Sequence, residues 1–436
     1  MNIQISQGAT TSPAPVAPRR LEETGLGLVM MRDLLLKAIF RRNLDTVSAM
    51  AQVVCMPVPL TQELVDICRT QKLIESMGSL TPSGSTEMAY QLTDAGRARA
   101  LDALSQSEYF GPMPVPLPAY KAQTKKQSVR NNRLTAEDLS RAMGHLILPE
   151  GFLDQLGPAV ASGRSVLLYG PPGNGKSAIS NGIRDAMGDR IFVPFCIEYA
   201  GQVITLFDPV VHTPVETPEQ QGSLLRHTGP SHDRRYVMCT RPTVITGGEL
   251  RLDMLDLNYN AVSRTYQASL QLKSTGGVFI VDDLGRQEEP PQALINRWIV
   301  PMEAGYDILA LQSGEKFEVP FDTLVIFSTN FHPNEMFDAA ALRRIFFKIK
   351  IDGPSREQFL RIFAMVAKAK GMPLDEKAMV HLMKHKYPAI DNVYANYHAP
   401  FLIDQMKAIC DFRSQPYHMT PDLIERAWAN LYVTQD

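Results

Sequence analysis

The strongest chemical signal in the sequence is a glycine-rich loop between an apolar strand pattern, SVLLY, and a helical pattern, AISNGIRDAM. Glycines allow backbone N–H groups to turn toward an anion, and the positive end of the following helix adds to the attraction. Lys176 would supply a mobile positive charge for terminal phosphates, and Ser177 a hydroxyl ligand for a metal ion. The residues predicted to bind the phosphates are Gly170, Pro171, Pro172, Gly173, Asn174, Gly175, Lys176 and Ser177.

Two carboxylates follow a second apolar strand pattern at residues 277–281. A carboxylate at the end of a buried strand is held rigidly, and here it would lie beside the phosphate loop. We expect Asp282 to hold a magnesium ion together with Ser177, and Asp283 to orient the attacking water as a general base. The alternative is that both acids cap a buried strand.

A third apolar strand pattern, residues 323–327, runs into Ser328, Thr329 and Asn330. We expect the Asn330 amide to position the same water. Further along, the sequence DAAALRR predicts a helix that ends in Arg343 and Arg344. These arginines could act on a terminal phosphate, or they could form surface ion pairs at a helix end.

Taken in order, these motifs resemble those of the AAA+ ATPase superfamily, from about residue 136 to the end of the sequence. GPPGNGKS resembles Walker A, VFIVDD resembles Walker B, STN resembles sensor 1, and Leu342–Arg344 resembles the helix end that bears the arginine finger. The resemblance implies ATP and Mg²⁺ as cofactors and hydrolysis of ATP to ADP and phosphate. It also implies a ring-shaped homo-oligomer, a hexamer, in which Arg343 or Arg344 reaches the neighbouring subunit's nucleotide.

The sequence departs from this family at two positions. Most relatives carry Glu where this chain has Asp283, which is one methylene shorter, so binding of ATP is better supported than hydrolysis. The sensor 2 arginine has no counterpart in the matching stretch, His398–Asp404, and that role is left unassigned. The 106 residues from Lys176 to Asp282 leave room for an insertion at about 205–275, predicted to form projecting hairpins as in MoxR-like members.

The N-terminal part has a different pattern. Helical periodicity covers Leu28–Arg42, Leu44–Val54 and Leu60–Leu73, and a two-stranded ribbon and a closing helix from Asp94 follow. This order resembles a winged-helix domain. The expected third helix balances its basic residues with acids, and the turn TPSGSTE has no basic residue. We therefore favour docking of a protein client or adaptor over DNA binding by this domain.

These patterns predict an α/β fold class: a P-loop three-layer AAA+ core with a C-terminal helical lid, preceded by a small α+β winged-helix-like domain. The expected divisions are a flexible tail at 1–24, the winged-helix-like domain at 25–106, a Pro-rich then basic linker at 107–135, the core at 136–352 and the lid at 353–436. With 436 residues, more than one domain is expected.

Composition narrows the class of protein further. The net charge is -2, so no global basic field draws the chain to nucleic acid or anionic lipid. Five scattered cysteines fit reduced thiols in the cytoplasm, and no stretch approaches the roughly 18 apolar residues of a membrane span, so no membrane insertion is expected.

Three functions fit this sequence. The first is an oligomeric ATPase that couples nucleotide turnover to remodelling of a protein client. The alternative is a nucleotide-switched DNA-binding regulator that uses the winged-helix-like domain and the five basic residues between 121 and 133. The third is a scaffold that binds ATP without meaningful hydrolysis.

Overall fold

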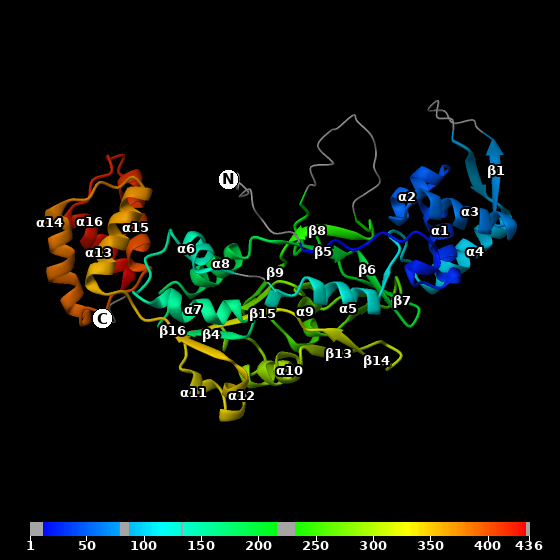
Figure 1. The fold of residues 1–436 in the computed structure, drawn as a ribbon. Coiled ribbons are helices and arrows are strands. Elements are labelled where there is room, and N and C mark those ends of the chain that lie inside the picture. The colour runs from blue at the N-terminus through cyan, green and yellow to red at the C-terminus, as the bar shows by residue number, and fades with distance from the viewer. Residues whose placement is uncertain (1–11, 79–86, 132–133, 216–231, 433–436) are drawn as a thin grey trace. The chain divides into compact units, whose positions relative to one another are not determined.

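The computed structural model describes residues 12–78, 87–131, 134–215 and 232–432. The chain divides into two compact units. Figure 1 labels the helices and strands described below. Unit 1 takes in Met1–Arg133, Met187–Phe279 and Asn296–Leu324, and unit 2 takes in Leu134–Ala186, Ile280–Ile295 and Val325–Asp436. The expected core at 136–352 is therefore divided between the two units. The physical reason is that residues 187–279 contribute to an apolar cluster shared with residues 115–120.

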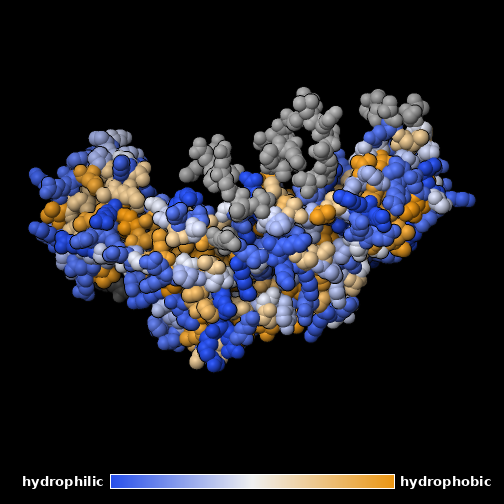
Figure 2. Space-filling model, in the orientation of Figure 1, coloured by the Kyte–Doolittle hydropathy of each residue, from blue (hydrophilic) through white to orange (hydrophobic). Residues whose placement is uncertain are grey.

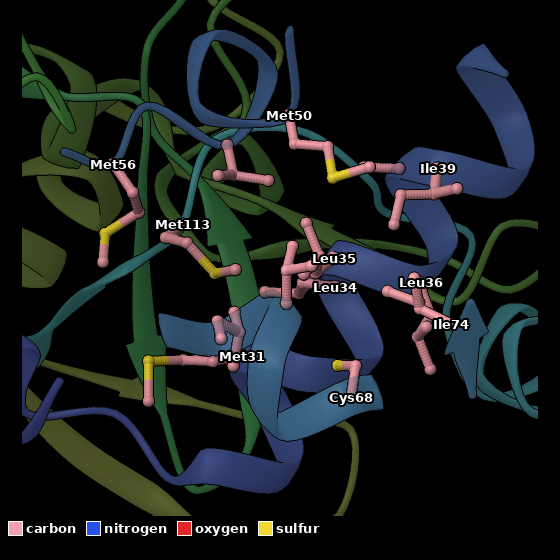
Figure 3. Close-up of a cluster of buried hydrophobic side chains, with 14 of the residues drawn as sticks. Met31, Leu34, Leu35, Leu36, Ile39, Met50, Met56, Cys68, Ile74 and Met113 are labelled. Atoms are coloured by element: carbon pink, nitrogen blue, oxygen red, sulfur yellow. The ribbon is translucent and has the colours of Figure 1, made fainter. Parts of the chain in front are cut away.

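The N-terminal part of unit 1 has the order of elements that the periodicity predicts. A short 3₁₀ helix, Glu22–Thr24, precedes α1 (Leu28–Arg42), α2 (Val47–Val54), α3 (Val58–Thr70), the ribbon β1 (Ile74–Gly78) and β2 (Ala89–Leu92), and α4 (Asp94–Gln106). The two strands pair antiparallel. Figure 3 shows the buried side chains that hold these elements together, among them Met31, Leu35 and Cys68. The turn TPSGST, residues 81–86, lies outside the described residues.

The prediction of a flexible tail is wrong for residues 12–24. The backbone oxygens of two prolines accept hydrogen bonds, that of Pro13 from Gln123 Nε2 at 2.8 Å and that of Pro15 from the Asp233 N–H at 2.9 Å. Leu21 is also buried in the apolar cluster of the N-terminal helices. Proline lacks an N–H but keeps its carbonyl acceptor, so a proline-rich segment can still be fixed by neighbouring donors.

The prediction of a linker at 107–135 is also wrong for most of its length. This segment contains β3 (Val115–Pro116), α5 (Leu117–Lys126) and a 3₁₀ turn at Val129–Asn131. Tyr120 is buried in unit 1, and Asp322 accepts hydrogen bonds from Ser128 Oγ and the Val129 N–H. Pro116 and Pro118 stand at the start of α5, since proline is well suited to the first turn of a helix, where its missing N–H costs nothing.

The rest of unit 1 consists of small sheets around a second apolar cluster. A five-stranded sheet has the order β10-β11-β7-β6-β3, and two-stranded sheets pair β5 with β8 and β13 with β14. The strands are β5 (Arg190–Pro194), β6 (Cys196–Tyr199), β7 (Gln202–Thr205), β8 (Tyr236–Thr240), β10 (Asn258–Asn260), β11 (Thr265–Gln267), β13 (Tyr306–Ala310) and β14 (Lys316–Pro320).

In the described residues of the expected insertion at 205–275, one hairpin, β10 with β11, lies between the 3₁₀ helix Leu252–Leu255 and α9 (Leu270–Lys273). This hairpin does not project freely, because β11 pairs parallel with β7 and its Tyr266 is buried. The preceding segment β9 (Thr243–Thr246) is a strand of the largest parallel sheet and not part of a hairpin. Residues 216–231 lie outside the described part of the chain.

Unit 2 contains the carboxyl ends of the strands predicted to carry the site. The sheet order is β16-β4-β15-β12-β9, and β4 pairs parallel with β15 and with β16. The other strands of this sheet are β4 (Val166–Tyr169), β12 (Val278–Val281), β15 (Leu324–Thr329) and β16 (Phe347–Lys350), while β9 belongs to unit 1. The helices of unit 2 in this region are α6 (Ala136–Ala142), α7 (Phe152–Ala161), α8 (Lys176–Ala186), α11 (Pro333–Met336) and α12 (Ala339–Arg344). Of α10 (Pro291–Ala304), residues up to Ile295 belong to unit 2 and the rest to unit 1.

The C-terminal part of unit 2 is helical, orange to red in Figure 1. It consists of α13 (Arg356–Ala369), α14 (Glu376–His381), a π-helical turn at Leu382–Lys386, a 3₁₀ turn at Tyr387–Ile390, α15 (His398–Phe412) and α16 (Pro421–Leu431). Its core is apolar and rich in aromatic side chains. Four α-helices are what the sequence predicts for this region.

Hydrophilic and hydrophobic residues are interspersed on the face of the molecule that Figure 2 shows. Within the described residues, no helix combines the length and the apolar character that a membrane crossing requires.

Candidate nucleotide site

The glycine-rich loop lies in unit 2 between β4 and α8. Gly170 has a φ of 137°, and a Cβ at this position would overlap the backbone oxygen of Ile351, so no larger residue fits. Gly173 and Gly175 also have positive φ values, of 75° and 90°. These conformations turn the loop back on itself before α8 begins at Lys176, which sets a helix N-terminus behind a ring of backbone N–H groups.

Lys176 is the buried cation of the loop. Its side-chain nitrogen donates hydrogen bonds to the backbone oxygens of Gly170 at 2.9 Å and Pro171 at 3.0 Å, and to Asn330 Oδ1 at 2.7 Å. Burial lowers the pKa of Lys176, and the nearby carboxylates of Asp283 and Asp282 oppose that effect. The lysine is therefore held at the loop by three acceptors, with a positive charge that two carboxylates support.

Ser177 and Asp282 form an oxygen pair at the edge of the loop. Ser177 Oγ donates to Asp282 Oδ2 at 2.7 Å, and Ser328 Oγ donates to the other carboxylate oxygen, Oδ1. No group of three or more His, Cys, Asp or Glu side chains in the described chain could hold a metal ion. The pair nevertheless fits Mg²⁺, which commonly binds one or two carboxylates and takes its other ligands from water and substrate phosphates.

Asp283 and Asn330 form the third part of the site. Asn330 Nδ2 donates to Asp283 Oδ1 at 3.2 Å, while Asn330 Oδ1 accepts from Lys176. One amide thus links the lysine to the carboxylate. Asp283 is exposed and has a φ of 50°, a left-handed conformation that Asp and Asn adopt more readily than most residues.

The two candidate arginines differ in their surroundings. Arg344 Nη1 donates to the backbone oxygen of Ala340 at 2.9 Å, within α12. Arg343 is exposed, and its guanidinium makes no hydrogen bond or ion pair with the described residues. Asp338 caps the start of α12 by accepting from the Ala341 N–H at 2.7 Å. Among the described residues, Arg343 therefore forms no hydrogen bond or ion pair with the other candidate site residues of the same chain.

One contact of the loop was missed by sequence reasoning. The two residues before α15 lie against it: the Tyr397 N–H donates to the Gly173 oxygen at 3.0 Å, and Asn396 Nδ2 donates to the Asn174 oxygen at 2.9 Å. The family pattern places an arginine within His398–Asp404, whereas the residue that contacts the loop is an amide two positions before that stretch. The one sequence signal for this contact is that Asn396 lies just before the start of α15.

Five of the predicted residues, Lys176, Ser177, Asp282, Asp283 and Asn330, are linked by side-chain hydrogen bonds. They come from three strand ends of one parallel sheet, which is where α/β proteins bind ligands. The arrangement offers a cation for phosphates, oxygen ligands for a metal ion and an exposed carboxylate that could accept a proton.

Comparison with known proteins gives one family match, and it covers only the C-terminal helices. Residues 355–430 match a family described as a domain of unknown function, DUF8689. No curated protein matches the chain by sequence.

Among solved structures, NtrX from Brucella abortus is similar at 13% identity and a TM-score of 0.41, over 68% of this chain and 58% of that one. The Holliday junction branch migration motor RuvB from Thermotoga maritima is similar at 14% identity and a TM-score of 0.36, over 69% and 71%. The BchI and BchD subunits of magnesium chelatase are similar at 15% identity and a TM-score of 0.33, over 64% and 90%. TM-scores this low carry no argument about function, so the proposed function rests on the geometry of the site.

Proposed function

We propose that the chain is an AAA+ ATPase that binds ATP with Mg²⁺, hydrolyses it to ADP and phosphate in a ring-shaped homo-oligomer, and uses the turnover to remodel a protein client. The observation that carries the proposal is the hydrogen-bonded group of Lys176, Ser177, Asp282, Asp283 and Asn330. Phosphoryl transfer to water needs charge stabilisation, a metal site and a residue that orients the water. This group supplies all three.

Binding of the phosphates depends on an exchange at Lys176. An ammonium group has three hydrogens, and three acceptors already bind them. A phosphate oxygen must therefore replace at least one acceptor. Asn330 is the most easily displaced of the three, because the other two are backbone oxygens of the loop itself. Loss of that bond would free the Asn330 amide to act on water.

Ser177 and Asp282 would hold Mg²⁺ beside the loop, and the bound ion would neutralise part of the phosphate charge. Ser328 holds Asp282 in place, because its hydroxyl donates to the Asp282 oxygen that does not bind Ser177. The carboxylate is thus fixed in a single orientation before the substrate enters.

Asp283 is the residue proposed to take the proton from water. It is exposed, and the Asn330 amide orients its carboxylate. Asp suits the backbone at this position, since φ is 50° and Asp tolerates left-handed φ values. These two features support hydrolysis despite the absence of the longer Glu.

Arg343 is proposed to complete the site of a neighbouring subunit. It is exposed and without a partner in the described chain, whereas Arg344 is bonded to its own helix. An arginine supplied in trans contributes roughly 10³-fold or more to phosphoryl transfer in comparable enzymes. The N-terminal helices and ribbon are proposed to form a winged-helix domain that docks the client or adaptor, and α13 to α16 to form the lid.

The docking role is supported by the surface of α3. A groove of about 560 Å³ lies along this helix and carries two acidic residues, Glu63 and Asp66. Carboxylates repel the phosphates of DNA, so this surface disfavours the alternative of a DNA-binding regulator. The groove is lined by Pro59, Gln62, Glu63, Asp66, Ile67, Thr70 and Gln71.

The test of the proposal is the Lys176→Ala variant. Removing the cation should reduce Mg·ATP affinity by at least about 100-fold, because a buried charge–phosphate contact is lost. Isothermal titration calorimetry measures this. The control is Lys377→Ala, which removes an exposed lysine of α14 and should bind as the wild type does. Equal ATP affinity in wild type and Lys176→Ala would refute ATP binding at this loop.

A further inference from the structure

The segment Asn396–Tyr397 is fitted closely to the Walker A loop. Three hydrogen bonds join them: from the Tyr397 N–H to the Gly173 oxygen at 3.0 Å, from Asn396 Nδ2 to the Asn174 oxygen at 2.9 Å, and from the Asn396 N–H to Asn174 Oδ1 at 3.3 Å. Asn174 itself is 4% exposed. A Cβ at Gly173 would overlap the ring of Tyr397, so the ring fills the space above the glycine. Both residues are therefore held in fixed positions against the loop.

One polar atom of this contact has no partner. Asn396 Oδ1 is buried and accepts no hydrogen bond from the described residues, although Nδ2 and the backbone N–H of the same residue are both used. The orientation of the amide is set by Nδ2, which must face the Asn174 oxygen because oxygen cannot donate there. A buried acceptor without a donor costs about 1–3 kcal/mol, so its presence calls for an explanation.

The surroundings of Asn396 suggest which ligand would satisfy its Oδ1. The side chain lies beside Gly175, since a Cβ on that glycine would be 3.6 Å from Asn396 Nδ2, and Gly175 immediately precedes Lys176. A ligand held by the loop would therefore lie near the amide that carries this acceptor. At neutral pH, Mg²⁺-bound triphosphate oxygens only accept hydrogen bonds. The donors of ATP are the ribose hydroxyls and the adenine amino group.

We propose that Asn396 accepts a hydrogen bond from the nucleoside part of bound ATP, and so makes the site prefer a nucleotide to bare triphosphate. The inference rests on the proposed function, because it requires ATP to bind at the Walker A loop. Asn396 would thus have two roles. Its backbone N–H and Nδ2 donate hydrogen bonds to the loop, and its Oδ1 would accept a hydrogen bond from the ligand.

The experiment compares two ligands on three proteins. Calorimetry measures the affinities of Mg·ATP and Mg·tripolyphosphate for the wild type, Asn396→Ala and the control Asn430→Ala, which removes an exposed amide of α16. One neutral hydrogen bond corresponds to about threefold to tenfold in affinity. We expect Asn396→Ala to lower the ratio of ATP to tripolyphosphate affinity by this factor, and Asn430→Ala to leave the ratio unchanged.

A second variant separates the two roles of Asn396. Asn396→Asp keeps an acceptor oxygen but loses the donor to the Asn174 oxygen, and its charge weakens binding of both anionic ligands. We expect both affinities to fall while their ratio stays close to that of the wild type. This variant also guards against misfolding of Asn396→Ala, because its shape is nearly that of Asn.

Two further ligands identify the donor. If the adenine amino group is the donor, the wild type prefers ATP to GTP and Asn396→Ala loses that preference. If a ribose hydroxyl is the donor, the same pattern holds for ATP against 2′,3′-dideoxy-ATP. Equal losses of ATP and tripolyphosphate affinity in Asn396→Ala, or no loss of either, would overturn the inference while leaving ATP binding intact. Failure of the wild type to bind ATP would instead overturn the proposed function.

Discussion

Asp283 combines two properties that bear on catalysis at the scale of a single residue. Its φ of 50° gives it a backbone conformation that a β-branched or bulky residue would adopt only with strain. Its carboxylate accepts from Asn330, whose other end binds Lys176. A change at this residue can therefore alter the proposed chemistry without removing the groups proposed to bind phosphate.

The Asp283→Asn variant should separate binding from turnover. Asn tolerates the same backbone conformation and has nearly the same shape, so Mg·ATP affinity should remain within about threefold of wild type. An amide cannot accept the proton of water, so steady-state phosphate release should fall by about 10²-fold to 10⁴-fold. Unchanged turnover would show that another group acts on the water. Lost affinity would place Asp283 in the binding of ATP instead.

Sequence spacing predicted which residues stand at the strand ends, but not how they are joined. The patterns around Lys176, Asp282 and Asn330 identify three strand ends, and parallel strands bring such ends to one edge of a sheet. The bond from Lys176 to Asn330 depends on the adjacency of β4 and β15, two strands that are far apart in the sequence. The spacing of residues along the chain does not show which strands are neighbours in the sheet.

At the scale of elements, α15 connects the glycine-rich loop to the core of the C-terminal helices. His398 begins the helix directly after Tyr397 and is 2% exposed. Its Nδ1 lies 3.1 Å from the Tyr387 hydroxyl and its Nε2 lies 3.2 Å from the Tyr432 hydroxyl. A shift of the loop contact would therefore be transmitted to side chains in the centre of the helical region.

The burial of His398 predicts a dependence of stability on pH. Desolvation lowers the pKa of His398 from 6.5 to about 4. The unfolded chain then binds a proton more readily than the folded one, so stability is full above pH 6.5 and falls as the pH decreases toward 4. The full loss from this residue is about 3 kcal/mol. Burial also lowers the pKa of His212 in unit 1 from 6.5 to about 4, so this residue contributes to the loss of stability over the same pH range.

Urea unfolding followed by circular dichroism, at several pH values between 7 and 4, measures this effect. His398→Gln should be less stable at neutral pH but should lose less stability on acidification, because glutamine does not titrate. The matched control is His418→Gln, at an exposed histidine of the same region, which should keep the wild-type slope. A His398→Gln slope equal to that of the wild type would contradict the assignment.

Elements with local signals could be predicted, whereas those defined by distant contacts could not. The apolar periodicity gave α1 at Leu28–Arg42, and glycine and strand patterns located β4 and β12. Residues 12–24 and α5 were misjudged because their proline content suggested an unpacked chain. Their actual positions depend on residues more than sixty positions away in the sequence, such as Asp233 for Pro15 and Pro13 for Gln123 of α5.

At the scale of the whole molecule, the proposed site is incomplete within one chain. The residues proposed to bind ATP and to accept the proton lie together in unit 2. Arg343 makes no hydrogen bond or ion pair with the described residues, and Arg344 donates to the Ala340 oxygen of its own helix. If Arg343 acts on the site of a neighbouring subunit, each chain contributes the surface around its glycine-rich loop to one interface and the surface around Arg343 to another. Contacts between unlike surfaces are heterologous, and they close into a ring when the rotation permits.

Arg343 is the arginine expected to act in trans, and mixing two inactive variants tests this. Arg343→Ala keeps an intact phosphate loop, and Lys176→Ala keeps an intact arginine. Each variant alone should lose turnover by about 10³-fold, since each removes one half of every site. In an equal mixture, about a quarter of the contacts pair an intact loop with an intact arginine, so phosphate release should recover to about that fraction of wild type.

Two results decide the outcome of the mixing experiment. Arg344→Ala is the control for Arg343, because its guanidinium is bonded to the Ala340 oxygen of its own helix, and its turnover should stay within about threefold of wild type. Recovery must also depend on total protein concentration, since a shared site forms only on association. A mixture no more active than the sum of its parts would mean that Arg343 does not complete a neighbour's site. The incomplete site in unit 2 would then need another source of positive charge.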